Sequence, residues 1–480
     1  MEKSPPWQGE RVQPLERRVK RLDLDKYSHI HFLGIGGIGV SAIARLLLAA
    51  GKKVSGSDVR ESSITLALVK QGATVAIGHS AKNLTGADLV VVSTAIPATN
   101  QELLAAKEAG LKVVHRSVVL DALMEGKNTI GVTGTNGKGS VSSMITWLLD
   151  AAGMLPSFAI GARLLDFDTN ARATESGFFV AELDESDGSF VNCHPDRLVL
   201  INLDADHLNH YKDLDGLLDT FEGYLSSDNA PKHIHYCADD ENLSQLMQGC
   251  KKKAISFGAA QDATYRIFDL ALVGMGSTFK MSGPSGDLGQ FELSLPGAYN
   301  AMNAAAAISV AIEEGADVEL LRAALPKFRG LENRFTVVPV GKGFVVKDYT
   351  SHPVGIKAVI DGAKVFGKGR IVTVFKPYRF TMIHYLHNEY RDAFQDADVS
   401  IITEMYTAGE VPIPGVDTPW LIERIRETGA EVIFVPKMED ITKTLNDIYK
   451  PDDTIVFFGG DDLFRLADEY IDGRLHPTVS

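Results

Sequence analysis

Lys138 lies in the part of the sequence with the clearest chemistry, the glycine-rich stretch GTNGKGS at residues 134–140. The stretch follows the apolar run TIGVT and precedes SVSSMITWLLDAAG, an order that predicts a strand, a tight loop and a helix. Backbone N–H groups of such a loop cradle phosphates, and a lysine ammonium adds positive charge near the β- and γ-phosphate oxygens. The sequence therefore predicts ATP binding by Gly134, Thr135, Asn136, Gly137, Lys138, Gly139 and Ser140.

This loop departs from the common phosphate-loop pattern GxxxxGK[ST] in two ways. Gly134 precedes Gly137 by only three positions, and Gly139 stands where a serine or threonine hydroxyl would bind Mg²⁺. Ser140 follows one position later, and we expect its hydroxyl to take that role.

Two acidic clusters follow apolar strand patterns further along the chain. GFFVAEL (177–183) runs into the acidic segment 182–187, and RLVLINL (197–203) runs into DADH at 204–207. Carboxylates and a histidine at strand ends beside a phosphate loop can hold Mg²⁺ against ATP oxygens. The alternatives are a solvated acidic loop and a structural His207, and the residue pattern alone leaves them open.

A second glycine-rich turn, GIGGIG at 34–39, lies between the strand pattern HIHFL and the helix pattern IGVSAIARLLLAAG. Its GxGxxG spacing lets backbone N–H groups approach a diphosphate at a helix N-terminus. Asp58 ends the next strand pattern, where a ribose-binding acid stands in such units. His79 and Ser93 follow further strand-like segments and are candidates for the same crevice. The pattern indicates a nucleotide diphosphate, but it does not separate a dinucleotide from a UDP-sugar or from a turn needed only for helix packing.

The elements that must position these residues alternate between strand and helix patterns, which predicts an α/β fold with mainly parallel sheets. At roughly 150 residues per domain, 480 residues fit about three domains. We expect an N-terminal extension (1–27), a Rossmann-like domain (28–126), a central phosphate-loop domain (127–334) and a C-terminal Rossmann-like domain (335–480).

Composition narrows the class of protein. A net charge of −14 disfavours nonspecific nucleic-acid binding, which depends on clustered lysine and arginine. The N-terminus has no apolar core of the kind that a secretory signal needs, and the apolar stretch near it is too short and glycine-rich to span a membrane. Three cysteines, Cys193, Cys237 and Cys250, have neither disulfide-framework nor zinc-site spacing. We therefore expect a cytoplasmic protein without a nucleic-acid or membrane partner.

Taken together, the motifs resemble those of the Mur ligase family, ATP-dependent amide-bond ligases of cell-wall peptidoglycan precursor synthesis. The resemblance covers roughly residues 29–470 and rests on the order and spacing of several stretches. They are HFLGIGGIGVSAIA, VSGSD, VVVSTAIPATNQE, GVTGTNGKGS, AELDESDGSF, INLDADHLNHY, PGAYNAMNA, ENRF, FKPYRFT and YTAGEVPIPGVD.

The resemblance implies a UDP-substrate-binding domain, a central ATPase and a C-terminal domain that helps to bind ATP and the amino acid. It implies that a substrate carboxylate forms an acyl-phosphate with ATP and that an amino acid's amine then displaces phosphate. The absence of lysine from DLDGLLDTFEGYL, where members that add later amino acids carry a carbamylated lysine, fits the branch that adds L-alanine to UDP-N-acetylmuramate. ATP and Mg²⁺ are the expected cofactors, and the expected assembly is a monomer or a homodimer.

The resemblance also assigns residues to roles. Mg²⁺ ligands are expected at Ser140, Glu182 and His207, and other nucleotide contacts are expected at Asn300, Arg334 and Asp348. The UDP-substrate is expected to contact Gly36, Gly37, Ile38, Asp58, His79 and Ser93. Catalytic groups are expected at Lys138, Glu182, His207, His352 and Arg379.

Several positions depart from the alanine-adding pattern. GTNGKGS replaces GTHGKTT and is closer to folylpolyglutamate synthase, a related ligase. In the third domain Ser351 replaces the first histidine of a double histidine, and Met382 replaces an arginine that could clamp a carboxylate. Two alternatives therefore stay open, a family paralogue with another amino acid or acceptor acid and a noncatalytic nucleotide-binding relative. An NAD-dependent oxidoreductase is a third alternative, but it leaves GTNGKGS and the acidic clusters unexplained.

Overall fold

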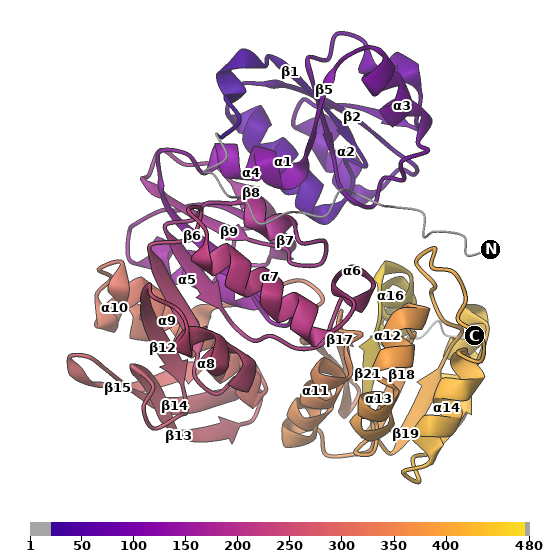
Figure 1. Cartoon of the computed structure of the whole chain (residues 1–480). Coiled ribbons are helices and arrows are strands. Elements are labelled where there is room, and N and C mark those ends of the chain that lie inside the picture. Colours follow the sequence, from indigo (N-terminus) through magenta and orange to yellow (C-terminus); the bar gives the residue numbers. More distant parts are fainter. Residues whose placement is uncertain (1–20, 476–480) are drawn as a thin grey trace. The chain divides into compact units, whose positions relative to one another are not determined.

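The structure, a computed structural model, describes residues 21–475, so the predicted N-terminal extension lies outside the described residues up to residue 20. Three sheets follow one another along the chain, which confirms the predicted α/β fold with mainly parallel sheets (Figure 1). By its internal contacts the chain divides into two compact units. Within the described residues, the first unit holds 21–205, 210–266 and 305–324, and the second holds 206–209, 267–304 and 325–475.

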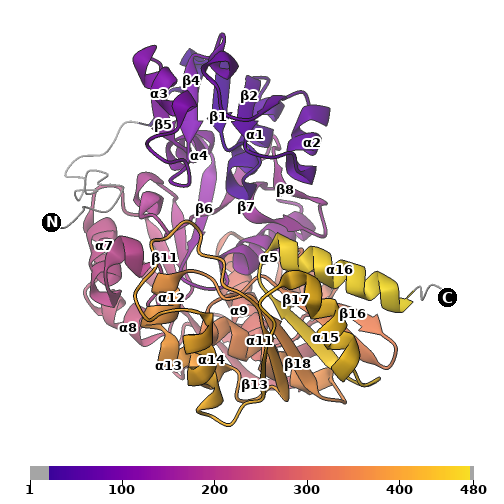
Figure 2. The same ribbon diagram turned by 90° about the vertical axis from the view of Figure 1, so that its right-hand side faces the viewer.

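The first sheet is entirely parallel, with strand order β3-β2-β1-β4-β5. Figure 2 labels β1, β2, β4 and β5 of this sheet. All five residues of β1 are buried, as expected for a strand covered on both faces. Its strands are β1 (His29–Leu33), β2 (Lys53–Asp58), β3 (Thr74–Ile77), β4 (Leu89–Val92) and β5 (Lys112–His115), and its helices are α1 (Ile38–Ala49), α2 (Ser63–Lys70), α3 (Gln101–Glu108) and α4 (Arg116–Leu123).

Local sequence explains where these helices begin. Ser62 and Thr65 form a reciprocal capping box at the start of α2, and Asn100 accepts hydrogen bonds from the backbone N–H groups of Glu102 and Leu103 at the start of α3. Gly37 precedes α1 without a side-chain cap. The backbone N–H groups at the start of α1 are therefore not taken by a capping side chain.

The second sheet has ten strands, in the order β15-β14-β13-β12-β11-β10-β6-β9-β7-β8. Its strands are β6 (Asn128–Thr133), β7 (Ser157–Leu164), β8 (Thr169–Arg172), β9 (Phe178–Glu182), β10 (Arg197–Leu200), β11 (His233–Cys237), β12 (Lys253–Gly258), β13 (Tyr265–Val273), β14 (Gly276–Gly283) and β15 (Gly286–Leu293). Its helices are α5 (Lys138–Ala151), α6 (Leu208–Tyr211), α7 (Leu214–Ser226), α8 (Glu241–Gln248), α9 (Ala298–Glu313) and α10 (Val318–Ala324). Most pairs are parallel, whereas β7–β8 and β14–β15 are antiparallel.

The third sheet has the order β16-β17-β21-β18-β19-β20, and only the β16–β17 pair is antiparallel. Its strands are β16 (Thr336–Val340), β17 (Gly343–Asp348), β18 (Ile371–Phe375), β19 (Val399–Ile402), β20 (Val432–Phe434) and β21 (Thr454–Phe458). Its helices are α11 (Pro353–Phe366), α12 (Phe380–Tyr385), α13 (His387–Ala393), α14 (Thr418–Arg426), α15 (Ile441–Ile448) and α16 (Asp461–Leu475).

No helix among residues 21–475 is both long enough and apolar enough to cross a membrane.

Candidate active site

The phosphate loop connects β6 to α5, as the sequence predicts, and two of its glycines have left-handed backbones. Gly134 has φ +133°, and a Cβ there would lie 2.8 Å from the Asn202 carbonyl oxygen. Gly137, directly before α5, has φ +91°. L-residues rarely adopt such angles, so both positions favour glycine. The N-terminus of α5 therefore begins immediately after a tight turn, which is the geometry that binds anions.

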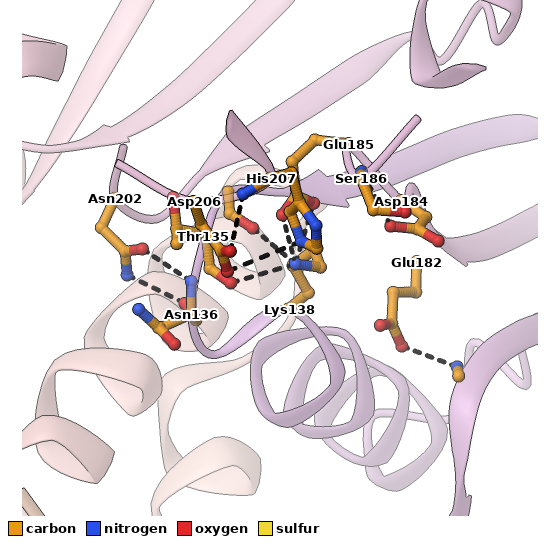
Figure 3. Close-up of polar contacts among 12 residues, drawn as sticks. Thr135, Asn136, Lys138, Glu182, Asp184, Glu185, Ser186, Asn202, Asp206 and His207 are labelled. Atoms are coloured by element: carbon orange, nitrogen blue, oxygen red, sulfur yellow. Dashed lines mark hydrogen bonds and ion pairs between the residues drawn. The ribbon is translucent and has the colours of Figure 1, made fainter. Parts of the chain in front are cut away.

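Asn202, a residue not predicted from the sequence, holds the loop in place (Figure 3). Its side chain accepts a hydrogen bond from the Asn136 backbone N–H at 2.7 Å and donates one to the Asn136 carbonyl at 2.8 Å. Its carbonyl accepts a third bond from the Thr135 N–H at 3.0 Å. The signal available in the sequence was its place near the end of the pattern RLVLINL, two residues after β10, the strand that pairs with β6.

Lys138 is part-buried within the loop that it belongs to. Its ammonium donates to the carbonyl oxygens of Gly134 (2.7 Å) and Thr135 (3.1 Å) and forms an ion pair with Glu185 at 2.8 Å (Figure 3). Glu185 is only 1% exposed. A triphosphate that reaches the loop meets a lysine whose donors are already directed toward the loop's own oxygens.

The Lys138–Glu185 pair has unusual protonation. Burial raises the pKa of the Glu185 carboxyl above its ordinary value, although Lys138 acts in the opposite direction. Burial disfavours the charge on Lys138, but Glu185 and Asp184 outweigh it, so the pKa of Lys138 lies above its ordinary value. The lysine therefore stays charged, as a group that neutralises phosphate oxygens must.

The acidic segment after β9 is not a solvated loop, because its carboxylates are individually paired. Glu182 accepts a hydrogen bond from the Gly161 N–H at 2.6 Å, and Asp184 forms an ion pair with Arg116 at 2.6 Å. Asp187 accepts a hydrogen bond from the Thr94 hydroxyl and lies 3.3 Å from a ring nitrogen of His115. Burial opposes ionisation of Asp184, but Arg116 and Lys138 lower the pKa of its carboxyl below its ordinary value.

The expected magnesium ligands come from both compact units. Ser140 lies in the first turn of α5 and Glu182 at the end of β9, both in the first unit, whereas His207 belongs to the second unit. His207 has φ +54°, and its backbone N–H donates to the Asp206 carboxylate at 2.6 Å. Across residues 21–475, no three His, Cys, Asp or Glu side chains are arranged to hold a metal ion.

The N-terminal glycine turn gathers four of the six residues predicted for the UDP-substrate. The Gly34 N–H donates to the Ser57 carbonyl, and the Gly36 N–H donates to the Asp58 carboxylate at 2.9 Å. Gly37 caps α1, and Ile38 begins it with an exposed side chain. A Cβ at Gly36 would lie 2.9 Å from an Asp58 carboxylate oxygen, so glycine is required there by close approach.

The other two predicted residues lie at the same edge of the first sheet. His79 follows β3, and its Nδ1 lies 2.9 Å from the Ser57 hydroxyl and 3.2 Å from the Glu102 carboxylate. Ser93 follows β4, and its carbonyl accepts a hydrogen bond from the Ile96 N–H. Because ligands of parallel α/β sheets bind at the carboxyl ends of the strands, both positions suit a nucleotide site. Glu102, a buried partner of His79, was not predicted from the sequence.

In the second unit, Asn300 is buried in α9 and donates to the Pro296 carbonyl at 2.7 Å. Asp348 accepts hydrogen bonds from the backbone N–H groups of Phe335 (2.9 Å) and Thr350 (2.8 Å). Burial raises the pKa of Asp348, and the nearby charge of Arg334 opposes that shift. The structure thus brings Arg334 and Asp348 within electrostatic range of each other.

His352 and Arg379, the expected amino-acid contacts, show features of a ligand site. His352 is 5% exposed at the N-terminus of α11, and neither ring nitrogen has a hydrogen-bond partner in the part of the chain that the structure describes. Arg379 has φ +64° and ψ +135°, a strained backbone for a residue with a Cβ. Its guanidinium lies 4.9 Å from the centre of the Tyr378 ring. Orphaned buried polar groups and strain both cluster at functional sites.

Comparison with known proteins gives matches along nearly the whole chain. Residues 29–128 match the family described as "Mur ligase family, catalytic domain", residues 132–311 the "Mur ligase middle domain", and residues 333–460 the "Mur ligase, glutamate ligase domain". The last name describes a domain family, and its substrate is not carried over to this chain.

Two curated relatives are similar over their full length. A UDP-N-acetylmuramate–L-alanine ligase from Myxococcus xanthus is 37% identical over 95% of this chain and 98% of its own length. A protein of the same name from Geobacter sp. (strain M21) is 37% identical over 92% of this chain and 97% of its own.

Solved structures share the fold. The UDP-N-acetylmuramate–alanine ligase of Thermotoga maritima superposes with a TM-score of 0.79 at 26% identity, covering 92% of this chain and 98% of that one. A murein peptide ligase from Psychrobacter arcticus has a TM-score of 0.72 at 23% identity, covering 94% and 100%. The family resemblance drawn from the motifs is confirmed, and the chain belongs to the Mur ligase family of ADP-forming acid–amino-acid ligases.

Proposed function

We propose that this protein uses ATP to join L-alanine to the carboxylate of UDP-N-acetylmuramate, a step of peptidoglycan synthesis. The observation that carries the proposal is the presence of two nucleotide-binding turns in one unit. One is the turn at Gly36 and Gly37, and the other is the phosphate loop around Lys138. The full-length relatives named UDP-N-acetylmuramate–L-alanine ligase support the choice of substrates.

The reaction proceeds in two steps. A carboxylate oxygen of the UDP-linked sugar acid attacks the γ-phosphorus of ATP, and ADP leaves with the electrons of the broken P–O bond. The amine of alanine then attacks the acyl-phosphate carbon, loses a proton and expels inorganic phosphate. Lys138, charged and held beside the loop's N–H groups, neutralises the oxygens of the phosphoryl group during transfer.

The residues of the phosphate loop region fit Mg²⁺ in their chemistry. Ser140 supplies a hydroxyl and Glu182 a carboxylate, the hard oxygen ligands that Mg²⁺ prefers, and His207 is the third expected ligand. Mg²⁺ usually keeps several waters and takes phosphate oxygens from its nucleotide, so it does not need a complete protein cage. When bound, the ion would neutralise charge on the ATP oxygens.

In the C-terminal sheet region, His352 and Arg379 are proposed to meet the incoming amino acid. An imidazole without partners and a guanidinium can both bind the α-carboxylate of alanine. Asn300, Arg334 and Asp348 are proposed to contact the adenine nucleotide, as the resemblance of the motifs to the family implies.

A second candidate keeps the chemistry but changes the amino acid or acceptor acid. Met382, in α12, cannot form the bidentate bond to a carboxylate that an arginine forms, and Ser351 lacks an imidazole. A less constrained carboxylate would let the site accept other amino acids.

The experiment is to measure phosphate release with ATP and Mg²⁺, offering UDP-N-acetylmuramate with each of a panel of amino acids, and to read the product mass. Release that requires both UDP-N-acetylmuramate and L-alanine, with a product heavier by one alanyl residue, is the expected result. A higher kcat/KM with another amino acid supports the second candidate. No release with any pair contradicts the proposed ligase activity.

A further inference from the structure

A buried carboxylate, Glu102, joins two histidines inside the first sheet. It lies in the first turn of α3, is 0% exposed and has one oxygen 2.7 Å from Nε2 of His31. The other oxygen lies 3.2 Å from both Nδ1 of His79 and the backbone N–H of Ser80. Although burial opposes ionisation, hydrogen bonds from His31, Ser57 and His79 lower the pKa of Glu102. An ionised carboxylate can only accept, so the facing nitrogens of both histidines carry protons.

The inner side of this hydrogen-bond network consists of His31, Ser55 and His29 and lies within the sheet. Because Nε2 of His31 donates to Glu102, its Nδ1 accepts from the Ser55 hydroxyl at 2.8 Å when the ring is neutral. Ser55 in turn accepts from Nε2 of His29, also at 2.8 Å. All three side chains are buried, so this half of the network serves the sheet rather than a ligand.

The outer side of the network consists of Ser57 and His79. It lies at the carboxyl ends of the strands of the same sheet, the edge where the nucleotide is expected to bind. The Ser57 hydroxyl bonds to Glu102, which leaves its oxygen free to accept from Nδ1 of His79 at 2.9 Å. Both groups that face Nδ1 are therefore acceptors, and they fix the imidazole with this nitrogen inward. Nε2, on the opposite side of the ring, is left to meet a ligand. Ser57 lies beside Asp58, whose carboxylate bonds to the glycine turn through Gly36.

We propose that Glu102 is a positioning residue for the UDP-linked substrate, holding the His79 ring with Nδ1 inward and Nε2 directed to the nucleotide. The inference rests on the proposed function, since it takes UDP as the ligand of this edge. A histidine held in one orientation before binding loses less conformational entropy when the ligand arrives, so affinity is gained without any contact between Glu102 and the ligand. The same logic applies where a carboxylate orients a histidine that binds a metal.

The test is calorimetric titration of UDP into the full-length protein without ATP or amino acid. H79A and E102A are each expected to weaken UDP binding about tenfold, the usual effect of removing one hydrogen bond of this kind. The double variant is expected to bind no more weakly than H79A alone, because Glu102 acts through His79. Two independent losses that multiply to about a hundredfold would overturn the inference.

Three further variants separate positioning from damage to the fold. E102Q keeps an oxygen that accepts from His79, so it is expected to restore UDP affinity to within about threefold of the wild type. S55A removes a buried hydroxyl from the inner side without touching Glu102 or His79, and its affinity is expected to match the wild type. If E102A does not fold, S57A replaces it, with a loss of about threefold that disappears in the H79A background.

The outcomes distinguish this inference from the proposed function. A wild type that does not bind UDP contradicts both. A wild type that binds UDP while E102A and S57A bind equally well contradicts only the positioning role. Equal weakening in S55A and E102A also contradicts it, because general destabilisation of the sheet would then explain the loss.

Discussion

Lys138 and Glu185 together determine what the phosphate loop can do before ATP arrives. The lysine donates to two carbonyl oxygens of its own loop and to a carboxylate that is almost fully buried. A buried pair of this kind contributes little net stability, because its desolvation cost offsets much of its attraction. We propose that the pair instead keeps Lys138 charged where the phosphate oxygens of ATP accumulate charge.

K138M should lower phosphate release at least about a hundredfold, because methionine fills similar space without the charge that stabilises the transferring phosphoryl group. The measurement is steady-state phosphate release at saturating UDP-N-acetylmuramate and L-alanine. K232M is the matched control, since the Lys232 side chain is 76% exposed and pairs with Asp196. Activity within a few-fold of wild type in K138M would contradict the role given to this residue.

Among single residues, those that belong to a motif were predicted from the sequence. Those whose side chains or backbone bond to the motif residues were missed. Lys138 and the glycines were predicted because the spacing of the loop is itself the signal. Asn202, Glu185 and Glu102 were missed as partners, because each acts through a contact with a residue 23 to 66 positions away. Such contacts depend on how strands pair, which single-sequence patterns do not specify.

Among the elements, β10 and β11 carry a buried basic pair whose protonation affects stability. Arg197 on β10 donates to Nε2 of His235 on β11 at 2.7 Å, and Nδ1 of His235 donates to the Ser309 hydroxyl at 3.1 Å. Burial, and then the charge of Arg197, holds the pKa of His235 well below its ordinary value. The ring is therefore neutral in the folded protein over the physiological range.

This arrangement predicts a loss of stability in mild acid. Below pH 6.5 the unfolded chain binds a proton at His235 that the folded chain does not, so stability falls as pH decreases, by up to about 1.4 kcal/mol per pH unit. The melting temperature of wild type should therefore fall by about 2 °C more than that of H235Q between pH 6.5 and 5.5. Parallel pH profiles for the two proteins would exclude His235 as the cause.

The strands that flank the phosphate loop were predicted because they are continuous apolar runs. β13, β14 and β15 were not predicted, since they form a meander in which exposed and buried residues mix and glycines interrupt the pattern. β7 and β8 were also missed: β7 pairs in parallel with β9 and antiparallel with β8, and the four-residue β8, with two buried residues, is too short to show a periodic pattern.

For the whole molecule, the sequence predicted the fold class, and the three matched family segments follow the predicted order of domains. The domain boundaries themselves stay predictions. The division into two compact units was not predicted, because its limits fall inside β13 and α9, two elements that are continuous in the sequence. Amino-acid composition does not mark a boundary between the units, because that boundary depends on which residues contact one another in the folded chain.

Two nucleotide sites in one chain should stabilise it independently. UDP and ADP are each expected to raise the melting temperature, and at about 100 times the dissociation constant the gain is about 2.7 kcal/mol. G36A should lose most of the shift with UDP and keep the shift with ADP, because a Cβ there meets the Asp58 carboxylate. K138M should lose most of the shift with ADP and keep the shift with UDP. A variant that loses both shifts would contradict the independence of the sites.

The central claim is that a sugar carboxylate is activated by phosphorylation before it is joined to an amino acid. It is tested most directly with UDP-N-acetylmuramate carrying ¹⁸O in both carboxylate oxygens, incubated with ATP, Mg²⁺ and L-alanine. The account predicts one ¹⁸O in each phosphate released and one in each new amide, because the oxygen that attacks ATP leaves with the phosphate. Unlabelled phosphate, or phosphate formed without a new amide, would contradict it.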